Sequence, residues 1–185
     1  MKIAVICWGS LFWDKGSLKT MGEWKNDGPE LPLEFCRLSS FGTSKERVTL
    51  VLDEASALCT TYWDLMVATD FKTARNNLRD REGAVTDEIH SFTRNQNPLS
   101  IIDQQIERWL SQHPEVDQVI WTGLTSNWEK FRRVKFSAED FVLYLNSKKD
   151  SLGEIKKYFD KAPPQAKTLG RQVFVKWCLD HSLTI

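Results

Sequence analysis

The sequence predicts an α+β fold, in which a mixed sheet or a distorted β-barrel carries helices on its outside. The first observation behind this prediction is order: strand patterns come first, and helical patterns are interspersed irregularly and cluster late in the chain. The second is size and composition. The chain has 185 residues, of which 41% are hydrophobic and 27% are charged, which is enough for one domain with a core of its own.

Six segments are predicted to be strands because β-branched and aromatic residues run together or alternate in them. The first is a continuous apolar run, which indicates a buried strand. The predicted strands are residues 2–8, 31–41, 47–52, 57–65, 85–92 and 118–124. Turn-forming residues 53–56 separate the third strand from the fourth, so these two strands are expected to pair as a hairpin.

Helices are predicted where apolar residues recur at helical spacing behind a capping residue. Thr69 or Asp70 can cap the first of them, and Ser137 begins a segment that resembles a capping box. The predicted helices run from 69 or 70 to about 81, from 97, from 137, and from 151 onward with a break at 163–164, and a short helical turn is expected within 14–21. Tryptophans 109 and 177 lie on apolar stripes and are expected in the core.

Charge and cysteine usage exclude several classes of protein. Lys plus Arg equals Asp plus Glu, 25 each, which argues against a broad nucleic-acid surface. The four cysteines are scattered without CxxC spacing and are expected to be reduced thiols in a cytoplasmic protein.

No apolar run approaches the roughly 20 residues of a membrane-spanning helix, and no signal-peptide core is recognised. The histidines lack metal-ligand spacing, so no metal site is expected.

A Gly-Ser pair directly after the first predicted strand is the most informative local feature. Glycine lets a backbone turn sharply, and successive N–H groups in such a loop can form a nest that binds an anion. An ordinary strand-to-loop turn remains the alternative interpretation. Ser10 is not expected to be a hydrolase nucleophile, because the G-x-S-x-G elbow is absent.

Glu82 is the candidate general acid/base. It lies where a predicted helix ends before a strand, and it can serve as a base if burial raises its pKa from the ordinary value of about 4.3. The alternative is a solvated charge run, in which Glu82 is flanked by Arg79 and Arg81.

Taken in order, these segments resemble the gamma-glutamylcyclotransferase family, and a divergent member of its glutathione-specific branch most closely. Residues 8–13, read as Trp-Gly-Ser-Leu-Phe-Trp, are similar to that family's Tyr-Gly-Ser-Leu-Ile-Trp motif. The segments that resemble its other landmarks are residues 47–51 with 61–62, residues 81–83 and residues 119–123. The resemblance covers roughly residues 2–145. We therefore expect a gamma-glutamylcyclotransferase-like domain over residues 1–145, with residues 146–185 as a C-terminal helical extension packed on the same domain.

The resemblance implies an activity, namely cyclisation of a small γ-glutamyl amine or peptide to 5-oxoproline with release of the amine. Glu82 would be the catalytic acid/base, and neither a metal nor a cofactor would be needed. The residues implied to bind substrate are Trp8, Gly9, Ser10 and Leu11. Trp8, Trp13 and Trp63, three of the eight tryptophans, could wall the cleft.

Two other functions stay open at this point. One is a non-catalytic binding module for small molecules on the same fold, because Trp8 stands where the family motif has a tyrosine. The other is an acyltransferase or amide hydrolase that uses the same pocket with an external nucleophile. The sequence leaves open which γ-glutamyl compound is used, the oligomeric state and the role of the C-terminal helices.

Overall fold

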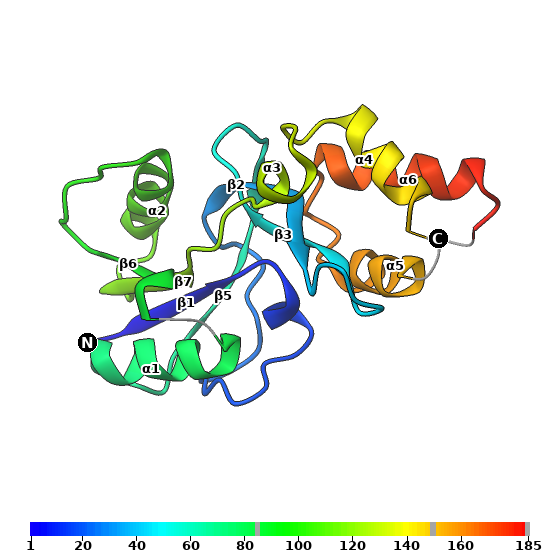
Figure 1. Cartoon of the computed structure of the whole chain (residues 1–185). Helices are drawn as coiled ribbons and strands as arrows, with labels where there is room; N and C mark the ends of the chain where they lie inside the picture. The colour runs from blue at the N-terminus through cyan, green and yellow to red at the C-terminus, as the bar shows by residue number, and fades with distance from the viewer. Residues whose placement is uncertain (84–85, 149–150, 184–185) are drawn as a thin grey trace. The chain divides into compact units, whose positions relative to one another are not determined.

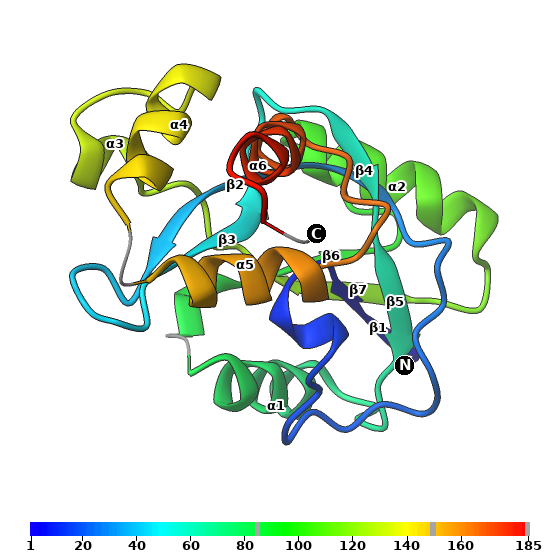
Figure 2. The same cartoon turned by 90° about the vertical axis from the view of Figure 1, so that its right-hand side faces the viewer.

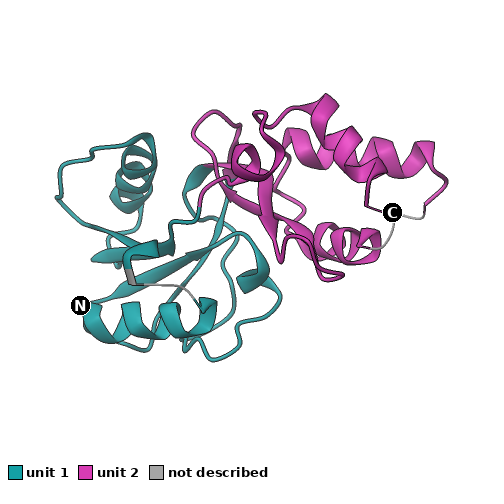
Figure 3. Cartoon of the chain, in the orientation of Figure 1, with its two compact units in different colours: residues 1–31, 60–124 teal, residues 32–59, 125–185 magenta. Residues whose placement is uncertain are grey.

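The structure, a computed structural model, describes residues 1–83, 86–148 and 151–183 (Figure 1). Contacts divide the chain into two compact units, unit 1 with residues 1–31 and 60–124 and unit 2 with residues 32–59 and 125–185 (Figure 3). Each unit combines a sheet with helices, which confirms the α+β class. The described strands form two sheets rather than one closed barrel. These units do not test the predicted boundary between residues 145 and 146, which stays a prediction.

Unit 1 is built on a mixed sheet with the strand order β5-β1-β7-β6. The central strand β1 (Ile3–Cys7) pairs antiparallel with β5 (Tyr62–Leu65) and parallel with β7 (Gln118–Thr122), and β7 pairs antiparallel with β6 (Ile89–Thr93). Every residue of β1 is buried. This matches its continuous apolar run, since a central strand is covered on both faces.

Two helices cover this sheet from opposite sides, α1 (Phe71–Glu82) and α2 (Ile101–Gln112), as both views show (Figures 1 and 2). Side chains of a strand alternate between its two faces. The core cluster on the α1 side therefore takes every second residue of β1; it contains Ile3, Val5, Cys7, Ala74 and Leu78. The unit also has two 3₁₀ turns, η1 (Ser10–Phe12) and η2 (Thr86–Glu88).

Unit 2 is built on a three-stranded sheet with the order β3-β2-β4. Its elements are β2 (Glu30–Ser39), β3 (Arg47–Leu52), β4 (Leu58–Thr60), α3 (Trp128–Arg132), α4 (Ala138–Asn146), α5 (Leu152–Lys161) and α6 (Leu169–Asp180). Aromatic rings join these layers: Phe159 of α5 stacks on Phe35 of β2 and on Phe174 of α6, each at 4.1 Å between ring centroids. The late apolar helices thus form the core of this unit.

Several local predictions are confirmed. Asp70 caps α1 by accepting a hydrogen bond from the Thr73 N–H, and Ser137 caps α4 in the same way. The predicted break at 163–164 falls between α5 and α6. Tryptophans 109 and 177 are buried, as expected.

The predicted hairpin between residues 47–52 and 57–65 is wrong. β3 pairs with β2, and the second segment is two strands, of which β4 joins the sheet of unit 2 and β5 joins the sheet of unit 1. The chain passes from one sheet to the other at Thr61, whose hydroxyl donates to the Pro29 carbonyl at 2.7 Å. Strand propensity alone could not show this division, because both halves suit a sheet.

Helix starts and turns account for the other corrections. The short helical turn expected within 14–21 lies at Ser10–Phe12 instead. Ser100, rather than Asn97, caps α2, because its hydroxyl accepts from the Asp103 N–H. Residues 128–132 form a helix that was not predicted. Of the strand predicted at 85–92, Val85 lies outside the described residues, and the observed strand is β6.

Among the residues that the structure describes, no helix is both long enough and apolar enough to cross a membrane.

Candidate functional site

The candidate site lies in unit 1, where the chain leaves β1. After Cys7 the backbone turns into η1, and the Phe12 N–H donates to the Gly9 carbonyl at 2.9 Å. The Leu11 side chain is only 5% exposed and belongs to the core cluster on the α1 side. Leu11 therefore anchors the turn, while Gly9 and Ser10 remain half-buried.

The second half of the site is the C-terminal end of α1. Gly83 adopts a left-handed conformation, with φ of 61°, and its N–H donates to the Arg79 carbonyl. Such a glycine ends a helix, because it takes the left-handed conformation without the steric cost of a Cβ. Glu82 is thus the last residue of α1, and the buried Ala74 and Leu78 hold the helix against the core.

Arg81 joins the two halves. Its Nη1 donates to Glu82 Oε1 at 2.6 Å and to Ser10 Oγ at 3.2 Å, and its Nη2 donates to the carbonyl of Asp14. The structure therefore brings together Ser10 and Glu82, both predicted as site residues. In the sequence, Arg81 stands out only as a partner in a surface charge run, because its place between Asp80 and Glu82 does not reveal the contact with Ser10.

The low exposure of its side chain distinguishes Glu82 from a residue in a solvated charge run. The side chains of Arg81 and Glu82 are only 8% and 16% exposed. Burial raises the pKa of the Glu82 carboxyl, and the nearby Arg81 cation opposes this shift without cancelling it. The flanking Arg79 instead pairs with the exposed Asp80 at 2.6 Å. The interpretation of Glu82 as one of several solvated charges is therefore wrong.

The Cys7 thiol lies close enough to Arg81 and Glu82 for their charges to act on it. The Cys7 thiol is buried, and burial raises its pKa, so Cys7 stays protonated and is a poor nucleophile at neutral pH. The ring of Phe12 lies 4.5 Å from that of Tyr62, measured between centroids. Burial also raises the pKa of the Tyr62 hydroxyl. The site thus combines a largely buried carboxyl and a buried cation with a buried, protonated thiol.

Two of the tryptophans predicted to wall the cleft are buried. Trp8 is buried, with 7% of its surface exposed. Trp63 packs edge-on against Trp109 of α2, and its indole N–H donates to Asp27 at 2.8 Å. Trp63 therefore faces the α2 side of the sheet, opposite the α1 side on which Cys7 packs. Its neighbour Tyr62 is the residue of β5 that contacts Phe12 of the site.

Within the described residues, no group of three or more His, Cys, Asp or Glu side chains is arranged to hold a metal ion. No family model, no curated protein and no solved structure matches this chain. The function must therefore be argued from the chemistry of the Glu82–Arg81–Ser10 cluster.

Proposed function

We propose that this protein is a gamma-glutamylcyclotransferase-like enzyme, in fold and in activity, that converts a small γ-glutamyl amine or peptide into 5-oxoproline and a free amine. One observation carries the proposal: the buried carboxyl of Glu82 is held by Arg81, which also contacts Ser10 in the turn after β1. A proton-transfer group thus lies beside the turn whose sequence resembles the family's substrate loop. The proposal requires neither a metal nor a cofactor.

In the proposed reaction Glu82 acts first as a base and then as an acid. Its carboxylate removes a proton from the α-amine of the substrate, and that nitrogen attacks the γ-carbonyl carbon of the same molecule. The C–N bond to the leaving amine then breaks, and Glu82 returns the proton to the departing nitrogen. A burial-raised pKa suits this cycle, because it lowers the cost of holding the proton between the two steps.

The remaining groups position the reactants. Arg81 fixes the Glu82 carboxylate and presents a cation near the oxygen that becomes negative when the amine attacks. Ser10 and Leu11 lie at the start of η1, where the first backbone N–H groups have no partner within the turn and can bind the substrate. Because the attack is intramolecular, holding the substrate in its folded form supplies much of the rate.

We further propose that the enzyme works in the cytoplasm. Cys7, Cys36 and Cys178 are free and buried, as expected for thiols in a reducing compartment.

Product analysis tests this proposal. The protein is incubated with a panel of γ-glutamyl amino acids, peptides and amines, and 5-oxoproline and free glutamate are measured separately. We expect 5-oxoproline from at least one compound. Glu82→Gln should lower kcat at least about 100-fold, because a positioned acid/base contributes this much or more. Asp80→Asn, at an exposed carboxylate of the same helix, should leave kcat unchanged.

Two results would overturn it. The absence of 5-oxoproline from every compound would reject the activity, and full release by Glu82→Gln would reject the role of Glu82. Free glutamate in place of 5-oxoproline would instead identify an amide hydrolase.

The second candidate is a non-catalytic binding module. It is favoured by the ion pair itself, since Glu82 Oε1 already accepts a hydrogen bond from Arg81. Saturable binding of a γ-glutamyl compound without any product would identify this function. Calorimetry on the samples used for the product assay distinguishes the two.

A further inference from the structure

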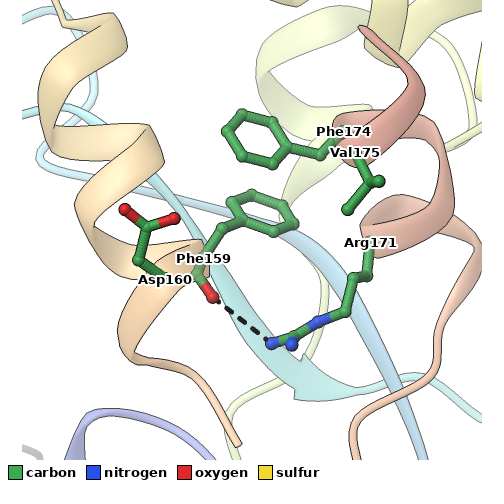
Figure 4. Close-up of a pocket in the computed structure, with 5 residues that line it drawn as sticks. All are labelled: Phe159, Asp160, Arg171, Phe174 and Val175. Carbon is green, nitrogen blue, oxygen red and sulfur yellow. Dashed lines mark hydrogen bonds between the residues drawn. The ribbon is translucent and has the colours of Figure 1, made fainter. Parts of the chain in front are cut away.

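A pocket of about 290 Å³ lies between α5 and α6, within unit 2 (Figure 4). The residues that line it are Phe159, Asp160, Arg171, Phe174 and Val175. None of them belongs to the Glu82 site, so the pocket is independent of the proposed cyclotransferase activity.

Arg171 is the cationic group of this pocket, and one of its buried donors has no acceptor. Its Nη2 donates to the carbonyls of Phe159 and Ala162, at 3.4 and 3.1 Å, which lie at the C-terminal end of α5. Its Nε is buried without an acceptor, and none of the described carboxylates lies within ion-pair distance of the guanidinium. Burial lowers the pKa of Arg171, so the charged form lacks compensation that an anion would provide.

The walls of the pocket are apolar. The rings of Phe159 and Phe174 stack at 4.1 Å with 17° between their planes, and Val175 lies one residue after Phe174 on α6. The pocket therefore has an apolar surface next to a single cation. A flat or branched apolar group of a ligand can pack on this surface.

Asp160 does not supply the missing anion. Its carboxylate pairs with Lys156 at 2.5 Å and is 43% exposed. In Figure 4 it points away from the Arg171 guanidinium. Asp160 thus pairs along α5 and acts on the Arg171 cation only through longer-range attraction, which leaves the buried Arg171 Nε without an acceptor.

From the pocket, its apolar walls and a guanidinium that has no carboxylate partner among the described residues, we infer that unit 2 binds a small carboxylate that carries an aromatic or branched apolar group. The carboxylate is held by Arg171, and the apolar group packs on Phe174 and Val175. Arginine is well suited to this, because its donors match the geometry of a carboxylate.

The test titrates phenylacetate into the ¹⁵N-labelled full-length chain and follows backbone amide signals by NMR. Phenylacetamide, which has nearly the same shape without the charge, is the matched probe. We expect saturable shifts confined to α5 and α6, with phenylacetate binding about tenfold more tightly than the amide, because a hydrogen bond to a charged group contributes at least this factor. Equal affinities, no saturation, or shifts centred elsewhere would overturn the inference.

Variants then assign the ligand to this pocket. Arg171→Gln should weaken phenylacetate binding about tenfold, and Lys176→Gln, which removes the same charge from an exposed position of α6, should not. Because Arg171 also holds the end of α5, Val175→Trp provides a second variant that fills the pocket and keeps the arginine. Val175→Trp should abolish binding. Wild-type affinity in Val175→Trp, or equal losses in the two charge variants, would reject the site.

Discussion

Glu46 in unit 2 is buried and Glu82 in unit 1 is largely buried, and each lies beside a basic residue, yet their pKa values move in opposite directions. In unit 2, Glu46 accepts hydrogen bonds from the Tyr144 hydroxyl at 2.7 Å, from the Gly42 N–H at 2.8 Å and from Lys148. Burial by itself would raise the pKa of Glu46, but these donors together outweigh it and lower the pKa. In unit 1, burial raises the pKa of Glu82 despite Arg81.

The difference shows that one basic neighbour is not enough to offset the rise in pKa that burial causes in a carboxyl. A buried carboxylate is stabilised by the number of donors that replace its water, and Glu46 has a hydroxyl, a backbone N–H and an ammonium. Among the described residues, Arg81 is the side chain that donates a hydrogen bond to the Glu82 carboxylate. Glu46 is therefore suited to holding structure, and Glu82 to exchanging a proton.

The largest effect on stability is expected at Glu46. Glu46→Gln keeps the shape of the side chain but removes the charge that Lys148 pairs with, and the Lys148 side chain is only 22% exposed. We expect the free energy of unfolding to fall by about 2 kcal/mol. Urea denaturation at neutral pH measures it.

Glu54→Gln is the control for that experiment, because Glu54 is exposed in the same unit. It should change the free energy of unfolding by less than about 0.5 kcal/mol. If Glu46→Gln changed the free energy of unfolding as little as Glu54→Gln, the hydrogen bonds of the Glu46 carboxylate would contribute nothing to stability.

A smaller effect is expected when Arg81 is replaced. Arg81→Gln removes the link between Ser10, Asp14 and Glu82, but Glu82 can take up a proton and so avoid being left as an unpaired charge. We expect the free energy of unfolding to fall by about 1 kcal/mol, the usual contribution of such hydrogen bonds. Arg79→Gln, which breaks the exposed pair with Asp80, should cost less than about 0.5 kcal/mol. Equal losses in the two variants would mean that Arg81 is only another surface arginine.

These contacts explain why some features could be predicted from the sequence and others could not. The predictions that succeeded rest on local signals, such as the apolar run of β1 or the Asp70 cap of α1. The partner of a strand and the partner of a charge are set by residues far along the chain. Arg81 contacts Ser10 across 71 positions, and Tyr144 reaches Glu46 across 98. The sequence therefore indicated Glu82 and the turn after β1, but not Arg81 as the residue that joins them.

The smallest effects are opposite changes of stability with pH. A lowered pKa in the folded state means that ionised Glu46 stabilises the fold above its unfolded pKa, and that this contribution is lost as the pH falls through its folded pKa. The raised pKa of Glu82 has the opposite sign, because the protonated form favours the fold and ionisation weakens it as the pH rises. Relative to wild type, Glu46→Gln should thus lose stability as the pH rises towards about 4.3, the ordinary pKa of a glutamate. Glu82→Gln should gain stability relative to wild type as the pH rises above about 4.3.

Urea denaturation of wild type and the two variants from well below about pH 4 to about pH 8 measures both slopes, with Glu54→Gln as the baseline for a lost surface charge. The opposite signs matter more than the sizes, because a general loss of charge would move both variants in the same direction. Parallel slopes would remove the distinction between a carboxylate held by several donors and a carboxyl left able to transfer a proton. Opposite slopes, together with loss of turnover only in Glu82→Gln, would locate the proton-transfer group in unit 1.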